Sequence, residues 1–378
     1  TGRTADSADS GSAFPETFVF DSDFMFGVAS APAHAEDQSI DAWIPFCESG
    51  KCHAWLDTPR RTERLRFWSN PTVELDLAAG LGASIYRMGV DWQRLSPHAP
   101  NGSAVACNAL NQVKLGSGPL TSANLRAIPA RWLEHSRGAD WLGSACSGVQ
   151  DFAALAHYRE MVQMVRAHGM KVMLTLFHHA LPDWLAARGG WLSGTTATEF
   201  EVFAADVARG LGDLVDMWIT INEPIRFALF TYVQGHWPPG TPTSYSDTVW
   251  RVVAKPDASF IGAATTLERA HRFAFDSLYE VHAQFGWPPP RVGLATRAQK
   301  WQPLTAFDIP TVAFYDAATK FDFIDKVKDK LDFVGLNYYG KEILHGTTIA
   351  QPPHEEYSET GGAIDAYALF ELLLEFRE

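Results

Sequence analysis

Residues 218–224 read Trp-Ile-Thr-Ile-Asn-Glu-Pro, and this stretch decides the fold class. The β-branched and aromatic residues of the apolar run 217–222 predict a buried strand that delivers Asn222 and Glu223 to its carboxyl end. Pro224 follows directly, and proline is favoured at the first position of a helix. Taken alone, Asn222 and Glu223 could simply cap that helix, so the meaning of the motif depends on the rest of the chain.

Five other short apolar runs also predict strands, at residues 26–30, 84–90, 171–177, 291–296 and 331–338. Apolar residues at helical spacing lie between these runs and after the last of them, in 70–81, 152–168, 198–213, 266–285 and 363–378. Alternation of strands and helices predicts a parallel sheet with the helices outside.

Unusual polar residues follow most of the predicted strands. They are His34 and Glu36, Asp91 and Arg94, His178 and His179, Asn222 and Glu223, and Asn337, Tyr338 and Tyr339. An eight-stranded βα barrel builds its active site at the carboxyl ends of its strands, so this pattern predicts an α/β fold of the (β/α)8 TIM-barrel class. Because only six strands are visible, about six of the eight βα units are expected, and we expect the chain to be C-terminally incomplete.

Composition divides the chain into a leader and one domain. Residues 1–16 are rich in Ser, Asp, Ala and Gly and predict a disordered leader. Residues 17–378 predict one partial barrel, interrupted at about 96–150 by an insertion rich in Gly, Pro, Ser and Asn.

Charge and cysteine content exclude several classes of partner. The 31 Lys and Arg against 44 Asp and Glu give a net charge of −13, which disfavours nucleic acid. No apolar run reaches the length of a membrane span, and membrane association through segments outside this chain stays open. Cys47 and Cys52 could pair, but free thiols are the better interpretation, and no metal site is predicted because adjacent His178 and His179 would point to opposite faces of a strand.

Glu223 has the features of a general acid. A carboxyl at the end of a strand, desolvated by aromatic residues such as Trp218 and Phe177, can hold a proton and donate it. Cleavage of a glycosidic bond needs such an acid to protonate the leaving oxygen. The 13 Trp residues also fit a site that stacks on sugar rings.

Five segments in a fixed order resemble glycoside hydrolase family 1, the β-glycosidases. They are FMFGVASAPAHAED, YRMGVDWQRL, VMLTLFHHALPDWL, WITINEPI and LDFVGLNYYG. The resemblance implies that Glu223 is the catalytic acid/base and that Arg87 and Tyr339 support the nucleophile. It also implies a substrate-binding set consisting of Asn222, which contacts the sugar 2-hydroxyl, with Asn337, His178, His34 and His179.

Three departures narrow the resemblance. The family usually has Gln at the position of His34, Gly at Asp37 and Trp at His179, so contacts to the sugar must differ. Together with APAHAED and LTLFHHALP, these departures resemble the plant and algal "sensitive to freezing" branch of the family. That branch implies galactosyl transfer between galactolipids, from monogalactosyldiacylglycerol to oligogalactolipids plus diacylglycerol through a galactosyl-enzyme, at the chloroplast outer envelope.

The family's nucleophile is absent from the 378 residues. The expected Thr-Glu-Asn-Gly motif does not occur, and Glu342, Glu355 and Glu356 stand at the wrong places. Retention needs two carboxyls, so we expect this chain alone to be inactive.

Several alternatives stay open at this point. The protein could be a hydrolytic β-glucosidase or β-galactosidase, or a non-catalytic carbohydrate-binding or interaction protein. Arg87 could belong to a structural ion pair, and His178 could be a satisfied core histidine. No cofactor is predicted, although a stimulatory divalent cation such as Mg²⁺ stays open.

Overall fold

The computed structural model describes residues 20–38, 40–51, 65–99, 148–240, 258–358 and 361–377. The predicted leader, 1–16, and most of the predicted insertion at 96–150 lie outside the described residues, so both remain predictions.

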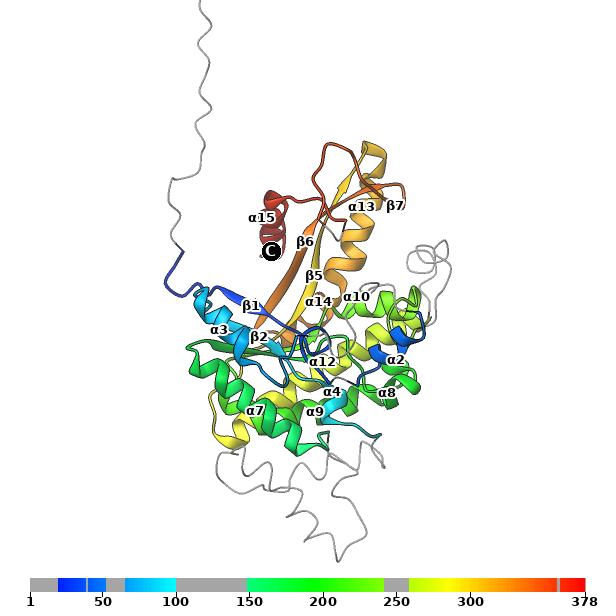
Figure 1. Cartoon of the computed structure of the whole chain (residues 1–378). Helices are drawn as coiled ribbons and strands as arrows, with labels where there is room; N and C mark the ends of the chain where they lie inside the picture. Colours follow the sequence, from blue (N-terminus) through cyan, green and yellow to red (C-terminus); the bar gives the residue numbers. More distant parts are fainter. Residues whose placement is uncertain are drawn as a thin grey trace, which may run out of the picture.

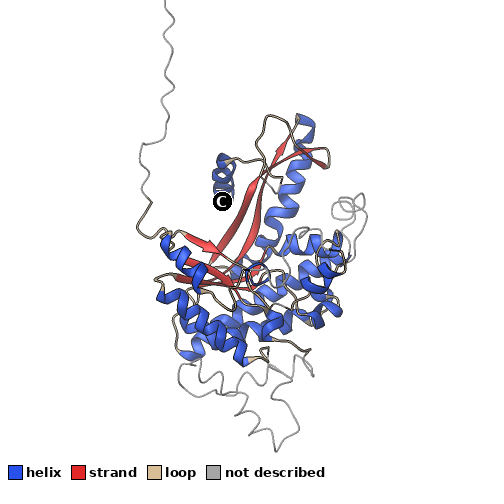
Figure 2. Ribbon diagram, in the orientation of Figure 1, coloured by secondary structure: helices blue, strands red, loops and turns tan. Residues whose placement is uncertain are grey.

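One twisted sheet contains all the described strands in chain order (Figures 1 and 2). The first six run parallel, each paired with the next, and the short seventh strand pairs antiparallel with the sixth. Their bounds are β1 Gly27–Ala29, β2 Ile85–Gly89, β3 Lys171–Phe177, β4 Met217–Asn222, β5 Val292–Pro303, β6 Phe333–His345 and β7 Thr348–Ala350. The six predicted strands are therefore confirmed, and β7 is an additional strand.

The sheet is an open barrel. Among the described residues β1 pairs only with β2, while β6 pairs with β5 and β7 and not with β1. The chain therefore forms six barrel strands, as the sequence predicts.

Helices cover the outer face of the sheet. The four that match predicted helices between strands are α3 Thr72–Gly80, α7 Phe152–Ala167, α9 Thr196–Leu211 and α12 Ala258–Phe285. The other α-helices are shorter and lie in the segments that connect or follow the strands. They are α1 Pro32–Ala35, α2 Trp43–Glu48, α4 Trp92–Leu95, α8 Asp183–Ala187, α10 Pro224–Ala228, α13 Ile309–Asp316, α14 Asp322–Val327 and α15 Ala366–Glu375. Single helical turns complete the list: η2 Gly190–Leu192, η3 Gly212–Leu214, η4 Leu229–Val233, η5 Ala306–Asp308, η6 Ala317–Phe321 and η7 Lys328–Lys330.

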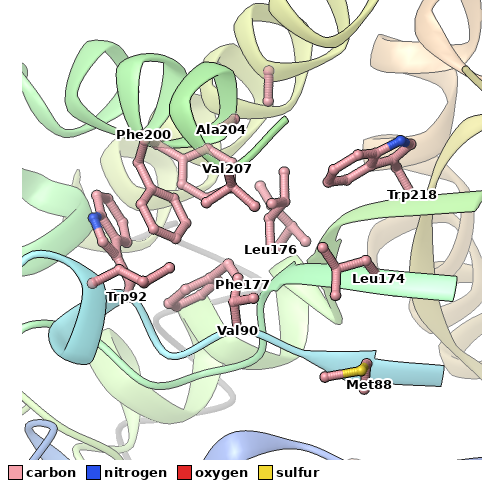
Figure 3. Packing of buried hydrophobic residues seen from close by; sticks show 14 of the residues in the cluster. Met88, Val90, Trp92, Leu174, Leu176, Phe177, Phe200, Ala204, Val207 and Trp218 are labelled. Atoms are coloured by element: carbon pink, nitrogen blue, oxygen red, sulfur yellow. The ribbon is translucent and has the colours of Figure 1, made fainter. Parts of the chain in front are cut away.

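The hydrophobic core lies between the sheet and these helices. Figure 3 shows Leu174 and Leu176 of β3 facing Ala204 and Val207 of α9, with all four side chains fully or nearly fully buried. Phe200 on the same helix is completely buried, which stabilises the fold by about 1.5–3 kcal/mol relative to an exposed ring. This layer holds the strands in place and so fixes where their carboxyl ends lie.

Strands β5 and β6 continue well past the barrel. They pair from Gly293 with Phe333 to Pro303 with Leu344, so the two strands rise above the other four as a two-stranded ribbon (Figure 1). Helix α15 packs beside this ribbon, where Lys300 of β5 forms ion pairs with Glu371 and Glu375.

Candidate active site

The carboxyl ends of four strands bring the predicted site residues together. Arg87 lies on β2, His178 directly follows β3, Asn222 ends β4, and Asn337 lies on β6. The amide of Asn222 is the centre of the resulting hydrogen-bond network. Its Oδ1 accepts hydrogen bonds from Arg87 Nη2 at 2.6 Å and from Asn337 Nδ2 at 3.1 Å.

A β-bulge turns Asn222 toward the inside of the barrel. Thr220 faces the helices, because its Oγ1 lies 2.7 Å from His271 Nδ1 of α12. Regular alternation would send Asn222 to the same side. The register shift places Ile219–Asn222 of β4 opposite only Gly293–Ala295 of β5, so one extra residue reverses the direction of Asn222.

Glu223 follows the bulge in a left-handed conformation, with φ of 47°. This backbone is sparsely populated for a residue other than glycine and costs on the order of 1 kcal/mol or more. Its N–H donates to Ala295 O at 2.7 Å, and Pro224 begins α10 directly after it. The carboxylate makes no capping hydrogen bond to α10, so the interpretation of Glu223 as a simple helix cap is wrong.

The carboxyl of Glu223 is instead held by the neighbouring strand. Asn337 Nδ2 donates to Glu223 Oε1 at 2.7 Å, and the residue is only 5% exposed. The prediction that Trp218 surrounds the carboxyl of Glu223 is wrong. Trp218 packs against His282 of α12, on the helix side of the sheet. Phe177, the other aromatic residue of that prediction, packs against Trp191 and Phe227.

Arg87 has hydrogen-bond partners but no ion pair among the described residues. Its Nε donates to Thr175 Oγ1 at 3.0 Å, in addition to the bond from Nη2 to Asn222. Burial lowers the pKa of Arg87, and the nearby carboxylate of Glu223 opposes that shift. Within the described chain, the alternative of a structural ion pair is therefore wrong, and the guanidinium sits inside the site beside a carboxyl that it does not directly contact.

Two histidines contact Asn222, and a third, His34, lies beside one of them. His178 Nε2 lies 3.3 Å from Asn222 Nδ2, and His179 Nε2 lies 2.9 Å from the backbone oxygen of Asn222. The ring of His178 is 5.1 Å from that of His179 and 6.1 Å from that of the exposed His34. Burial lowers the pKa of His178 well below its usual range and that of His179 to about 3, so both rings are neutral.

The prediction that His178 and His179 point to opposite faces is wrong. β3 ends at Phe177, and His179 has a positive φ of 66°, so strand alternation no longer applies. The ring of His179 packs against the rings of Phe227 and Trp237, with centroids 5.6 and 4.5 Å away. His178 is not a satisfied core histidine either, because its buried Nδ1 has no hydrogen-bond partner among the described residues.

Tyr339 lies at the rim of the site and is 44% exposed. Burial of its hydroxyl and the nearby charge of Glu223 raise its pKa, so the phenol is neutral. The guanidinium of Arg297 stands 5.1 Å from the centre of the ring.

Sequence reasoning missed a charged cluster beside Glu223. Arg297 on β5 forms an ion pair with Glu342 of β6 at 3.0 Å. Arg226, three residues after Glu223, stacks on Phe230 with its guanidinium carbon 3.7 Å from the ring centre. Burial and the charge of Arg297 lower the pKa of Arg226 to about 10, against the opposing charges of Glu342 and Glu223.

The described residues contain no group of three or more His, Cys, Asp or Glu side chains arranged to hold a metal ion. Cys52, the second cysteine of the possible pair, lies outside the described residues. The expectations about cofactors and the Cys47–Cys52 pair therefore remain predictions. No helix in the described ranges is both long and apolar enough to cross a bilayer.

Comparison with known proteins gives a consistent picture. The profile of "Glycosyl hydrolase family 1" matches residues 146–322. "Beta-glucosidase-like SFR2, chloroplastic" of Oryza sativa subsp. japonica is 31% identical over 445 residues, which cover 97% of this chain and 62% of that protein. "Galactolipid galactosyltransferase SFR2, chloroplastic" of Arabidopsis thaliana is 31% identical over 404 residues, which cover 94% of this chain and 57% of that protein. The chain thus spans about three fifths of the length of these two relatives.

The solved structures that match are family barrels. A family 1 β-glucosidase from Thermotoga maritima, in complex with isofagomine lactam, superimposes with a TM-score of 0.70 at 18% identity, over 95% of this chain and 75% of that one. This likeness confirms the incomplete TIM barrel. The profile match and the two plant relatives show a glycosyl hydrolase family 1 domain in this chain, with a resemblance to the SFR2 proteins.

Proposed function

We propose that the protein in which this chain occurs transfers galactose between galactolipids, from monogalactosyldiacylglycerol to a second galactolipid. The observation that carries the proposal is the buried carboxyl of Glu223. Asn337 Nδ2 donates to its Oε1 at 2.7 Å, and the hydrogen bond from Arg87 to Asn222 lies beside it. The name of the Arabidopsis relative supports the choice of galactolipid as substrate. The names of both plant relatives support a chloroplast location, and we extend this to the outer envelope.

In this proposal Glu223 works in both half-reactions. It first gives its proton to the glycosidic oxygen, so that diacylglycerol leaves as an alcohol while a carboxylate nucleophile bonds to the galactose C1. It then takes the proton from a hydroxyl of the acceptor galactolipid, whose oxygen attacks C1 and releases the nucleophile. We assign no residue of this chain to the nucleophile, because the Thr-Glu-Asn-Gly motif does not occur in it.

The neighbours of Glu223 have supporting roles in the proposal. Arg87 and Tyr339 hold and tune the nucleophile, since a guanidinium and a phenol hydroxyl both donate to a carboxylate. Asn222 contacts the sugar 2-hydroxyl, a hydrogen bond that strengthens in the transition state. Asn337, His34, His178 and His179 contact the remaining hydroxyls.

A product assay tests the proposal. The protein expressed from its natural gene is incubated with monogalactosyldiacylglycerol labelled in galactose, and oligogalactolipids are separated from free galactose. Transfer products support the proposal, whereas free galactose alone identifies a hydrolytic β-glycosidase. Sugar binding without turnover identifies a carbohydrate-binding protein.

The variant Glu223→Gln links the activity to the site. It cannot protonate the leaving oxygen, so transfer should fall by roughly 10²–10⁴-fold. Glu280→Gln, on the exposed face of α12, is the matched control and should keep its rate. A Glu223→Gln variant that retains most of its rate removes Glu223 from the catalytic role.

A further inference from the structure

The far end of the β5–β6 ribbon is an ordered protrusion, which we call the ribbon tip and define as residues 303–311 and 344–352. Leu304 N donates to Leu344 O at 2.9 Å, which joins its two segments. Asp308 fastens them further, since its carboxylate accepts from Gly346 N at 2.7 Å and from Thr305 N and Oγ1 at 2.9 and 2.7 Å. The tip is therefore a fixed structure.

Large apolar side chains project from this tip into solvent. Phe307 is 94% exposed, the highest value among the exposed large hydrophobic residues of the described chain. Ile309, Ile349 and Leu304 are 55%, 51% and 42% exposed. Exposed Phe and Ile side chains add no stability to the fold, because they are not removed from water. An exposed apolar patch of this kind marks a site of contact with a partner or a membrane.

The tip is also nearly free of charge. Its eighteen residues contain no Lys, Arg or Glu and a single Asp, although 20% of the whole chain is charged. That Asp308 is buried and engaged in the hydrogen bonds described above. The one other titratable group is the imidazole of His345, whose Nδ1 lies 3.5 Å from Asp308 Oδ2.

The position of the tip relates it to the site. Strand β5 passes Glu223 at Ala295, whose oxygen accepts the Glu223 N–H, and then continues to Pro303. Eight further residues at about 3.3 Å each carry the tip roughly 25 Å beyond that point. The tip thus projects beyond the carboxyl ends of the barrel strands, on the side of the sheet that holds Glu223, and Figure 1 shows it standing away from the other strands.

We propose that the ribbon tip contacts the uncharged surface of a galactolipid bilayer, with Phe307 and Ile309 inserted among the headgroups; this rests on the proposed function for the identity of the lipid. Charge decides the kind of surface. A chain of net charge −13 is repelled by anionic lipids, and the tip carries no basic residues to offset that repulsion. Sugar headgroups carry no charge, and aromatic side chains favour the boundary between headgroups and acyl chains.

Vesicle co-sedimentation of the full 378-residue chain tests the proposal without any turnover. Vesicles of digalactosyldiacylglycerol with phosphatidylcholine are compared with vesicles in which phosphatidylglycerol replaces the galactolipid. We expect binding to the uncharged vesicles and weaker binding to the anionic ones. The double variant Phe307→Ser with Ile309→Ser should bind the uncharged vesicles roughly tenfold or more weakly, because burial of an apolar side chain supplies the affinity.

Matched controls exclude general effects of exposed apolar residues. Leu81→Ser changes an 82% exposed residue just before β2, at the opposite end of the sheet, and Phe370→Ser changes a 51% exposed residue of α15. Both should bind vesicles as the unsubstituted chain does. Circular dichroism melts establish that each variant is folded, and Phe307→Ser alone should show a smaller loss than the double variant.

Several results would overturn the proposal: no binding to uncharged vesicles, equal binding by the double variant, or equal loss with Phe370→Ser. A dimer in analytical ultracentrifugation that the double variant abolishes, with vesicle binding unchanged, would assign the tip to a second copy of the chain. A separate assay tests the proposed function: the natural protein is given a water-soluble aryl galactoside, and absence of galactosyl transfer from it would show that the proposed function fails. That substrate does not involve the bilayer.

Discussion

Replacing Asn222 by Ala tests whether the amide at the centre of the network binds the sugar 2-hydroxyl. Asn222 Oδ1 accepts from Arg87 at 2.6 Å and from Asn337 at 3.1 Å, while its Nδ2 donates toward the neutral His178 at 3.3 Å. Alanine removes all three contacts and leaves the guanidinium of Arg87 with one partner fewer in a buried place. The substitution therefore affects both stability and catalysis.

The magnitudes follow from these contacts. A hydrogen bond to a charged group contributes about 1.5–3 kcal/mol, so we expect the free energy of unfolding to fall by about 2–3 kcal/mol, measured by urea titration. A lost contact to the 2-hydroxyl of about 1.5–3 kcal/mol corresponds to roughly 10–150-fold in kcat/KM. Loosening of Arg87 adds to this loss, since small misplacements of a catalytic group also cost rate.

A substrate lacking the hydroxyl isolates the contact. The natural protein and its Asn222→Ala variant are each assayed with an aryl β-galactoside and its 2-deoxy analogue, and the ratio of kcat/KM is taken for each protein. The intrinsic reactivity of the analogue cancels between the two ratios. Loss of the hydroxyl should cost the natural protein at least tenfold more than it costs the variant. Equal ratios in the two proteins would refute the role of Asn222. Glu280→Ala, on the exposed face of the outer helix α12, is the control.

Three further changes have definite expected outcomes. Restoring Gln at 34 and Trp at 179 should raise activity on aryl glucosides relative to monogalactosyldiacylglycerol, and an unchanged ratio would remove both histidines from sugar selection. Burial raises the pKa of Glu36 from 4.5 to about 8, against the opposing charge of Arg94. The folded state therefore keeps its proton at pH values where the unfolded state loses it. The contribution of Glu36 to the free energy of unfolding is full below pH 4.5 and is lost as the pH rises to 8. Glu36→Gln should therefore gain on the order of 2–4 kcal/mol over the unsubstituted chain between pH 5 and pH 8 in urea titrations, and a constant difference would contradict the shift. Arg226→Met removes a largely buried guanidinium that has no ion pair among the described residues, so it should raise the free energy of unfolding by about 1 kcal/mol while lowering kcat/KM at least tenfold; unchanged activity would exclude Arg226 from the site.

Strands β3 and β4 could be predicted well because nearly all of their residues are buried. Continuous apolar runs define β3 and β4, and both have the bounds that the sequence predicts. The ribbon was missed because β5 and β6 become polar beyond Thr296 and Tyr338, where Arg297, Gln299 and Lys300 hide the strand signal. Those residues are strand because β6 pairs with them across about forty residues of sequence, which no local pattern reveals.

The site was predictable in its members and not in its geometry. Motifs indicated Asn222 and Glu223, but alternation from Thr220 would have turned Asn222 toward the helices. The bulge that corrects this arises from pairing with β5 and leaves no local sign in the sequence. Arg226 and Arg297 lie outside the recognised motifs, although an arginine three residues after the proposed acid Glu223 is a signal in the sequence.

The hydrogen bonds of the site also depend on the register in which the strands of the sheet pair. Arg87, Thr175, Asn222 and Asn337 come from four different strands, and every link between them is 3.1 Å or shorter. A slip of one residue between any two of these strands would turn a member of the network to the opposite face. Because β5 lies between β4 and β6, the network can form only after β2, β3, β4, β5 and β6 have all paired in register. Assembly of the site and completion of this part of the barrel are therefore one event. The ribbon tip needs only β5, β6 and β7, which is why its apolar residues can be changed without disturbing Glu223.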